Sequence, residues 1–221
     1  MSLAELQELT RRMTRADESL VTIDDVDAAL SLAVLHYSDT RPRLLVSEVP
    51  APAGPTLSPP DGWEAGFSVL RECETEGDDP SVAPTPLDVA TIRLEETAGG
   101  WRMRLPITLS SGLLRLWFTT SHQLTQESDS LSGRDREAVV IYAAAHLLEQ
   151  LAIAKSGDLD STIGAASVSH STPAREYAAR AKTLRQRYGE LLGVDSDRTP
   201  AAGVVVSLGS HRPRPIRACG W

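Results

Sequence analysis

Apolar residues in the first part of the chain recur with the period of an α-helix. A short helix is expected over residues 2–13, either on the surface or as an arm that orders only against a partner, because its opposite face is charged. A better-marked helix starts at Thr22, which has the spacing of a capping box with Asp25. It ends at Arg41-Pro42, since a residue that precedes proline avoids the α conformation.

Two further helices are predicted in the second half of the chain. Residues 132–154 carry the strongest helical pattern and start with a capping-box spacing at Ser132. The last helix follows Thr172-Pro173, an N-cap with proline at the first helical position, and ends at Gly193. The positions expected to pack the three longer helices are Ile23, Val26, Leu30, Val34, Tyr37, Ile141, Tyr142, Ala145, Leu148, Tyr177, Leu184, Tyr188 and Leu191.

The middle of the chain, about residues 63–122, changes to the pattern of strands. Short runs rich in β-branched and aromatic residues are bounded by turn residues, and in residues 101–107 apolar side chains alternate with arginines. Residues 95–100 supply a hairpin turn. We expect three or four antiparallel strands, with the acidic segment 72–86 as a mobile loop. The Pro-rich run 50–60 is expected to be a stiff connector.

These patterns predict an α+β fold with a helical bundle core, an inserted small antiparallel β lobe and an extended C-terminal arm. The expected divisions are residues 1–50 for the N-terminal helices, 51–125 for the linker and β lobe, 126–194 for a helical hairpin that completes the core, and 195–221 for the arm. Residues 44–49 (LLVSEV) also fit one extended strand.

Composition narrows the classes of function. The chain has 221 residues and a formal net charge of −8, so it is not expected to bind nucleic acid over its general surface. No apolar run approaches the ~20 residues of a membrane span, and the N-terminal residues lack the apolar core of a signal peptide. Cys73 and Cys219 are far apart in sequence and are expected to be free thiols.

The sequence offers few candidate catalytic or metal-binding residues. The five histidines show no metal-ligand spacing, and a triad built from a serine, His170 and an aspartate such as Asp160 lacks a nucleophile-elbow motif. The acidic cluster in residues 72–79 is more typical of a solvated loop than of a calcium site. The basic face of the last helix fits either DNA contact or a solvated, ion-paired surface. We therefore expect no catalytic, cofactor or metal site.

Two segments resemble a known family. Residues 141–193 contain an Ala-rich helix, a long small-residue linker with an acid and a Val-Ser-His step, and an amphipathic helix with an Arg/Leu/Tyr pattern. Residues 22–43 contain a helix that ends in Tyr-Ser followed by an Arg/Pro exit. In this order they are similar to the head–tail connector (adaptor) proteins of tailed bacteriophages. The β-rich insertion and the long C-terminal arm depart from the minimal pattern of that family.

The resemblance implies a virion structural protein, made in the host cytoplasm, that forms a ring of about twelve copies at the head–tail junction. Its implied partners are further copies of itself, the phage portal protein and a tail-side neck or tail protein, with genomic DNA passing through the lumen without sequence-specific binding. The linker 156–173 would then contact a neighbouring subunit, the channel or the portal. The arm residues expected to dock on the portal are Val204, Val205, Val206, Leu208, Arg212, Arg214, Arg217 and Trp221.

Two other classes of function stay open from sequence. One is a small hydrolase-like enzyme, which would need a pocket that holds His170 near a serine and an aspartate. The other is a cytosolic helical adaptor that is unrelated to virions.

Overall fold

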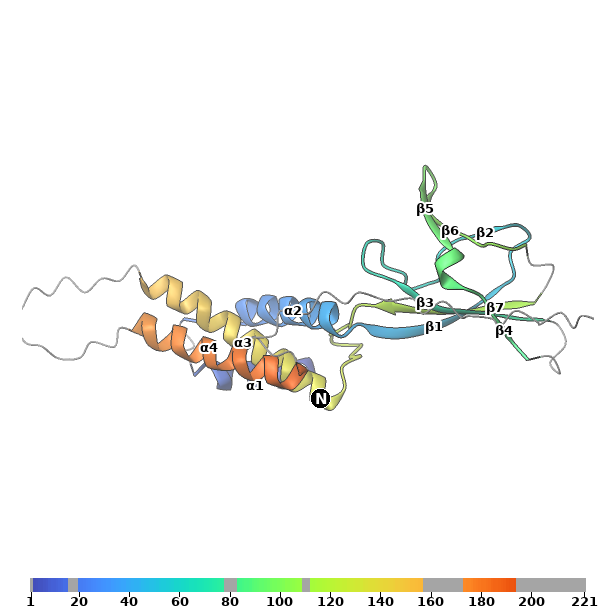
Figure 1. Ribbon diagram of the computed structural model, residues 1–221. Coiled ribbons are helices and arrows are strands. Elements are labelled where there is room, and N and C mark those ends of the chain that lie inside the picture. Colours follow the sequence, from blue (N-terminus) through green and yellow to red (C-terminus); the bar gives the residue numbers. More distant parts are fainter. Residues whose placement is uncertain (1, 16–19, 78–82, 109–111, 157–172, 194–221) are drawn as a thin grey trace, which may run out of the picture.

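The computed structural model describes residues 2–15, 20–77, 83–108, 112–156 and 173–193. Within these ranges the protein is mixed α+β, with four α-helices and two antiparallel sheets. The helices form one end of an elongated molecule and the sheets form the other, and helix α2 leads directly into strand β1 (Figure 1). The predicted α+β class is therefore confirmed.

The first two helices start at capping boxes. Helix α1 (Leu3–Thr14) begins after Ser2, whose hydroxyl accepts from the backbone N–H of Glu5 while the Glu5 carboxylate accepts from the Ser2 backbone. Helix α2 (Ile23–Thr40) repeats this arrangement with Thr22 and Asp25, as the sequence predicts.

The helical hairpin is also formed as expected. Helix α3 spans Gly133–Ser156, and helix α4 spans Pro173–Leu192. Gly193 ends α4 in the left-handed conformation with a φ of 68°, which glycine adopts without steric cost.

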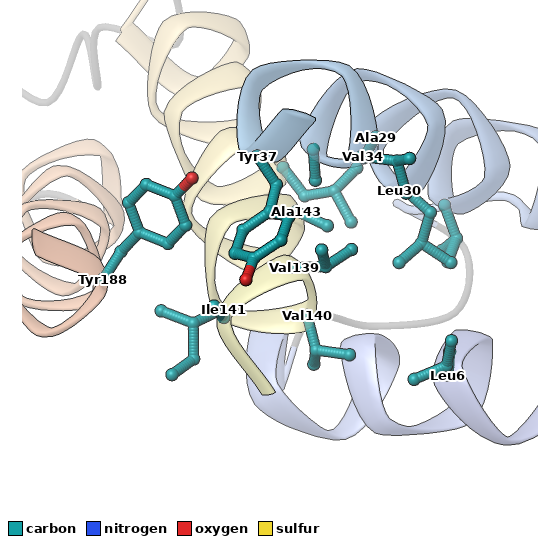
Figure 2. Packing of buried hydrophobic residues seen from close by; sticks show 14 of the residues in the cluster. Leu6, Ala29, Leu30, Val34, Tyr37, Val139, Val140, Ile141, Ala143 and Tyr188 are labelled. Carbon is teal, nitrogen blue, oxygen red and sulfur yellow. The ribbon is translucent and has the colours of Figure 1, made fainter. Parts of the chain in front are cut away.

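Helix α3 lies at the centre of the helical core. Figure 2 shows α3 between α4 on one side and α1 and α2 on the other, with Leu6 of α1 directed towards Val140. The sequence predicts one apolar face for α3, but its buried residues surround the helix because three helices pack on it. The buried residues of α3 are Ala138, Val139, Val140, Ile141, Ala143, Ala144, Ala145, Leu147, Leu148 and Leu151.

Two expectations about single elements are corrected. Helix α1 is not only a surface element or arm, because Leu6, Thr10 and Thr14 are buried against the rest of the core. Ile23 is 43% exposed at the start of α2, whereas the other predicted packing positions are buried or packed against the core.

By length and composition α3 is the one helix among the described residues that could cross a membrane, whereas the sequence predicts no membrane span. More than half of its most apolar stretch is buried inside the protein, so this apolar character is what a central core helix requires.

The β part contains a four-stranded sheet with the order β1-β7-β3-β4 and a three-stranded sheet with the order β2-β6-β5. A short 3₁₀ helix, η1 (Val89–Thr91), precedes β5. The strands of the first sheet are β1 (Arg43–Pro50), β7 (Leu113–Thr120), β3 (Leu70–Glu76) and β4 (Thr85–Pro86). The strands of the second sheet are β2 (Thr56–Leu57), β6 (Gly100–Arg104) and β5 (Arg93–Thr97).

Strand β3 corrects the expectation of a loop over residues 72–86. Its acidic side chains did not resemble a strand, but Glu72, Glu74 and Glu76 alternate with Cys73 and Thr75, and Cys73 is buried. The carboxylates therefore follow the two-residue period of a sheet with one solvated face. Strand β1 pairs along its full length with β7, so the β part starts at Arg43 rather than at residue 51.

A second, smaller core lies under the sheets. Leu114, Leu116 and Phe118 point inward from β7 and are fully buried, and Trp63 packs at 5.6 Å from the Phe118 ring. The other buried members are Leu70, Cys73 and Leu105.

Polar contacts join the two ends of the molecule where α2 runs into β1. The backbone N–H of His122 donates to the hydroxyl of Ser38, and a ring nitrogen of His122 lies 3.0 Å from the Arg41 carbonyl. The His122 ring also contacts the ring of Tyr37 at 5.3 Å. These contacts attach the end of β7 to the end of α2. The two cores are therefore held together by non-covalent contacts as well as by the chain itself.

Candidate assembly surfaces

An aromatic and charged cluster fastens α4 to α3. The guanidinium of Arg185 donates two hydrogen bonds to the Glu149 carboxylate, at 2.9 and 2.8 Å, and lies 3.8 Å from the centroid of the Tyr142 ring. The hydrogen bonds from Arg185, with a smaller contribution from its charge, outweigh burial and lower the pKa of Glu149. Glu149 is therefore held in its ionised form, which Arg185 needs as a partner.

His36 extends this cluster to α2. Its ring stacks on Tyr142 at 4.3 Å, and its Nδ1 lies 3.1 Å from the hydroxyl of Tyr188. Burial, followed by the nearby charge of Arg185, lowers the pKa of His36, while Asp39 opposes this shift. Burial also raises the pKa of Tyr188 to about 12, so the phenol stays protonated. The cluster therefore ties three helices together through the His36 ring, which contacts Tyr142 of α3 and Tyr188 of α4.

The basic face of α4 is largely used inside the protein. Arg180 donates to the carbonyls of Met13 and Thr14 at the C-terminal end of α1, and Arg187 pairs with Glu137 of α3. The sequence left DNA contact and a solvated surface open for this face. The contacts of Arg180, Arg185 and Arg187 support a structural role, with partners on α1 and α3 rather than on α4 itself.

Helix α2 keeps an apolar stripe that its neighbours leave exposed. Leu32 and Leu35 are 40% and 55% exposed, on the side of the helix opposite its buried residues. The sequence pattern predicts only the buried face of this helix. The spacing of the two leucines with Ala28 was the available signal, but a pattern cannot say which of two apolar stripes a neighbour covers.

A second exposed apolar area lies on the outer face of the β1-β7-β3 sheet. Leu44 and Val46 of β1 are about half exposed, and Val46 lies opposite Trp117 of β7. Towards the far end of the same face Arg115 pairs with Glu48 and Glu76. The face is therefore apolar near the helices and charged at the far end.

Among the described strands β1 also lies at an edge of its sheet, because β7 is its only partner there. The backbone N–H of Ala51 donates to the Gly112 carbonyl, and the register is continuous from there along the strand. In an antiparallel ladder every second residue points its backbone groups to the partner, so those of Leu44, Val46 and Glu48 point away from β7. As far as the described residues show, this edge offers backbone donors and acceptors without partners, beside exposed apolar side chains.

Chemistry-bearing side chains do not gather into a reactive centre in the described ranges. No group of three or more His, Cys, Asp or Glu is placed there to hold a metal ion. Cys73 is a free thiol, and burial, helped by the charge of Glu74, raises its pKa to about 11. His146 is partly exposed on α3, where its Nε2 lies 3.0 Å from the Gln150 side-chain amide. An open hollow along α1 is lined by Ala4, Glu5, Glu8, Leu9 and Arg12.

Several predicted positions lie outside the described residues. They are the linker 157–172, which includes His170 and Asp160, together with Thr172, Cys219 and the predicted docking residues of the arm, Val204, Val205, Val206, Leu208, Arg212, Arg214, Arg217 and Trp221.

Comparisons with known proteins do not identify a family. No family model matches the chain, and no curated protein matches it significantly.

Proposed function

We propose that this protein is a virion structural component of a tailed bacteriophage, which forms a homo-oligomeric ring at the head–tail junction. In this proposal one rim of the ring binds the portal, the other rim binds a tail-side neck or tail protein, and the lumen extends the DNA channel. The protein acts by shape and contact, without a catalytic centre.

The observation that carries the proposal is the packing of α2, α3 and α4. The described parts of the two segments that resemble connector proteins, within residues 22–43 and 141–193, come together around the central helix α3. This supports a connector-like bundle core, because the resembling segments form one packed unit in which α2 and α4 both contact α3 and meet each other at His36 and Tyr188.

The exposed surfaces support an assembling protein. A folded chain that leaves Leu35, Leu44 and Val46 more than half exposed has apolar area that a neighbour can bury. These residues lie on α2 and on the adjoining β1, which leads away from the bundle (Figure 1). The β part then projects from the ring, outward or towards the tail, and its β1 edge and outer face are available to the tail-side partner.

The charge distribution fits a channel wall that DNA passes without binding. The chain is acidic overall, and three of the five cations of α4 have partners within the protein. A lumen with few free cations lets a polyanion slide, since strong binding to phosphates needs clustered Lys and Arg.

The test is to purify the full chain alone and with the portal protein of the same phage, and to image both by electron microscopy. The expected result is a closed ring that stacks on the portal along one axis. Deletion of residues 199–221 should abolish attachment and leave the helical circular dichroism signal intact. A chain that never associates with its portal, in either form, would disprove the proposed function.

A further inference from the structure

The outer sides of α2 and α4 carry opposite charge. Helix α2 contains four aspartates and no lysine or arginine, whereas α4 contains five cations and two glutamates. Both helices pack on α3, from different sides (Figure 2), and each leaves one side exposed. The exposed side of α2, called the acidic stripe, consists of Asp24, Ala28, Leu32, Leu35 and Asp39. One line of residues on the exposed side of α4, called the basic stripe, consists of Arg175, Ala178, Ala179, Lys182 and Gln186, and the exposed Glu176, Thr183, Arg187 and Glu190 lie beside it.

The basic stripe holds the cations that the fold does not use. Arg180, Arg185 and Arg187 contact α1 or α3, but none of the ion pairs found in the described ranges involves Arg175 or Lys182. Both are exposed, and small alanines lie between them. A neighbouring helix can therefore approach the backbone of α4 closely while both cations reach across to it.

The acidic stripe is complementary to the basic stripe in charge and in the size of its apolar side chains. Leu32 and Leu35 stand exposed at its middle, and Asp24 and Asp39 lie towards its two ends. Leucines that pack on the alanines of another α4 would bury apolar area on both helices. At about 1.5 Å per residue the acidic stripe runs roughly 22 Å from Asp24 to Asp39, and the basic stripe runs roughly 16 Å from Arg175 to Gln186, with its two cations roughly 10 Å apart.

We propose that the acidic stripe of one copy packs against the basic stripe of the next copy, and that this contact joins the subunits of the ring. Pairing like stripes would place aspartate against aspartate or cation against cation, which is unfavourable. Unlike stripes on different sides of one molecule make a head-to-tail contact, which builds a ring where the rotation between copies closes and an open filament where it does not. The inference rests on the proposed function for the ring and adds the surfaces that build it.

Charge reversal in full-length protein tests the contact. One variant carries Asp24→Lys and Asp39→Lys, and the other carries Arg175→Glu and Lys182→Glu. Each variant alone has two stripes of the same sign, so its assembly should require at least about tenfold more protein than wild type, measured by sedimentation velocity and native mass spectrometry. Mixing the two variants makes every contact attractive again, and rings should reform with the variants in alternation.

Matched variants separate the contact from folding and from general charge effects. Leu35→Asp should also impair assembly and leave the thermal melt unchanged, because Leu35 is 55% exposed. Arg71→Glu, a charge reversal at an exposed position of β3, should assemble as wild type. Recovery only in the mixture is a result that a general folding defect would not produce.

The outcomes distinguish the two proposals. If wild type forms rings and both charge-reversed variants assemble equally well, the stripe contact is overturned while the proposed function stands. If rings form through the stripes but bind no portal, the contact stands and the proposed function fails. If wild type stays monomeric with and without portal, both are wrong.

Discussion

Replacing Arg185 with methionine should weaken the attachment of α4 to α3. Methionine keeps an unbranched apolar side chain against Tyr142 but removes the guanidinium. The structure gives this guanidinium two hydrogen bonds to Glu149 and a position 3.8 Å from the Tyr142 ring centroid. The side chains of Arg185 and Glu149 are 28% and 40% exposed, so solvent screens part of their attraction.

The expected loss follows from these contacts. A cation over an aromatic ring contributes about 1 kcal/mol when it is partly desolvated. A partly exposed ion pair contributes about 0.5 kcal/mol, even with two hydrogen bonds. We therefore expect Arg185→Met to lower the free energy of unfolding by about 1.5 kcal/mol. Arg185→Lys should lose about 1 kcal/mol, since it keeps the charge but not the planar donor pair.

Urea unfolding at pH 7, followed by circular dichroism, measures this loss without adding salt. A double-mutant cycle with Glu149→Gln isolates the ion pair, whose coupling should be about 0.5 kcal/mol and should shrink in 1 M salt, while the contribution of the ring contact persists. An Arg185→Met protein within 0.3 kcal/mol of wild type would show that these contacts do not stabilise the fold and that Arg185 is available to outside partners.

Three further predictions concern the two cores. Tyr37→Phe removes the hydrogen bond to Asp135 and should cost about 1–2 kcal/mol in urea unfolding. Gly112→Ala should destabilise by about 2 kcal/mol or more in the same assay, because φ is 99° and a Cβ would lie 2.1 Å from the Glu76 carbonyl oxygen. The folded pKa of His36 lies below its ordinary value of 6.5, so His36 contributes stability above that pH which is lost as pH falls through the folded pKa. His36→Asn should therefore show a flatter fall in melting temperature between pH 7 and pH 5.

The Tyr37 and Gly112 predictions each have a matched control variant. Tyr177→Phe alters a partly buried phenol of the same core and should change stability by less than about 0.5 kcal/mol. Gly54→Ala should be tolerated, since no atom lies within 4 Å of an added Cβ there. Parallel pH profiles for wild type and His36→Asn would show that another group titrates. A Gly112→Ala protein as stable as wild type would contradict the close approach of β3 to the start of β7.

Local chemistry made much of the fold predictable. The Thr22 and Asp25 capping box, the proline at the start of α4 and the glycine after its end act within a few residues, so the boundaries of α2 and α4 follow from the printed sequence. The hairpin turn before β6 and the alternation of apolar residues with arginines along β6 are equally local. The sequence therefore determined the four helices and the longer strands β1, β5, β6 and β7, but not the acidic strand β3, the two-residue strands β2 and β4 or the 3₁₀ helix η1.

Partners across the chain were decided only by the tertiary structure. Arg185 and Arg187 meet glutamates of α3 that are 36 and 50 residues away, and the burial of Leu6 depends on an α3 that is apolar on all sides. Likewise, only the tertiary structure shows that no described element covers the exposed leucines of α2 or pairs with the outer edge of β1. Caps, turns and periodicity depend on near neighbours in sequence. Pairing and exposure depend instead on which faces meet when the helices and sheets pack. The packing arrangement is the one that minimises the free energy of the whole molecule, so no single segment determines it.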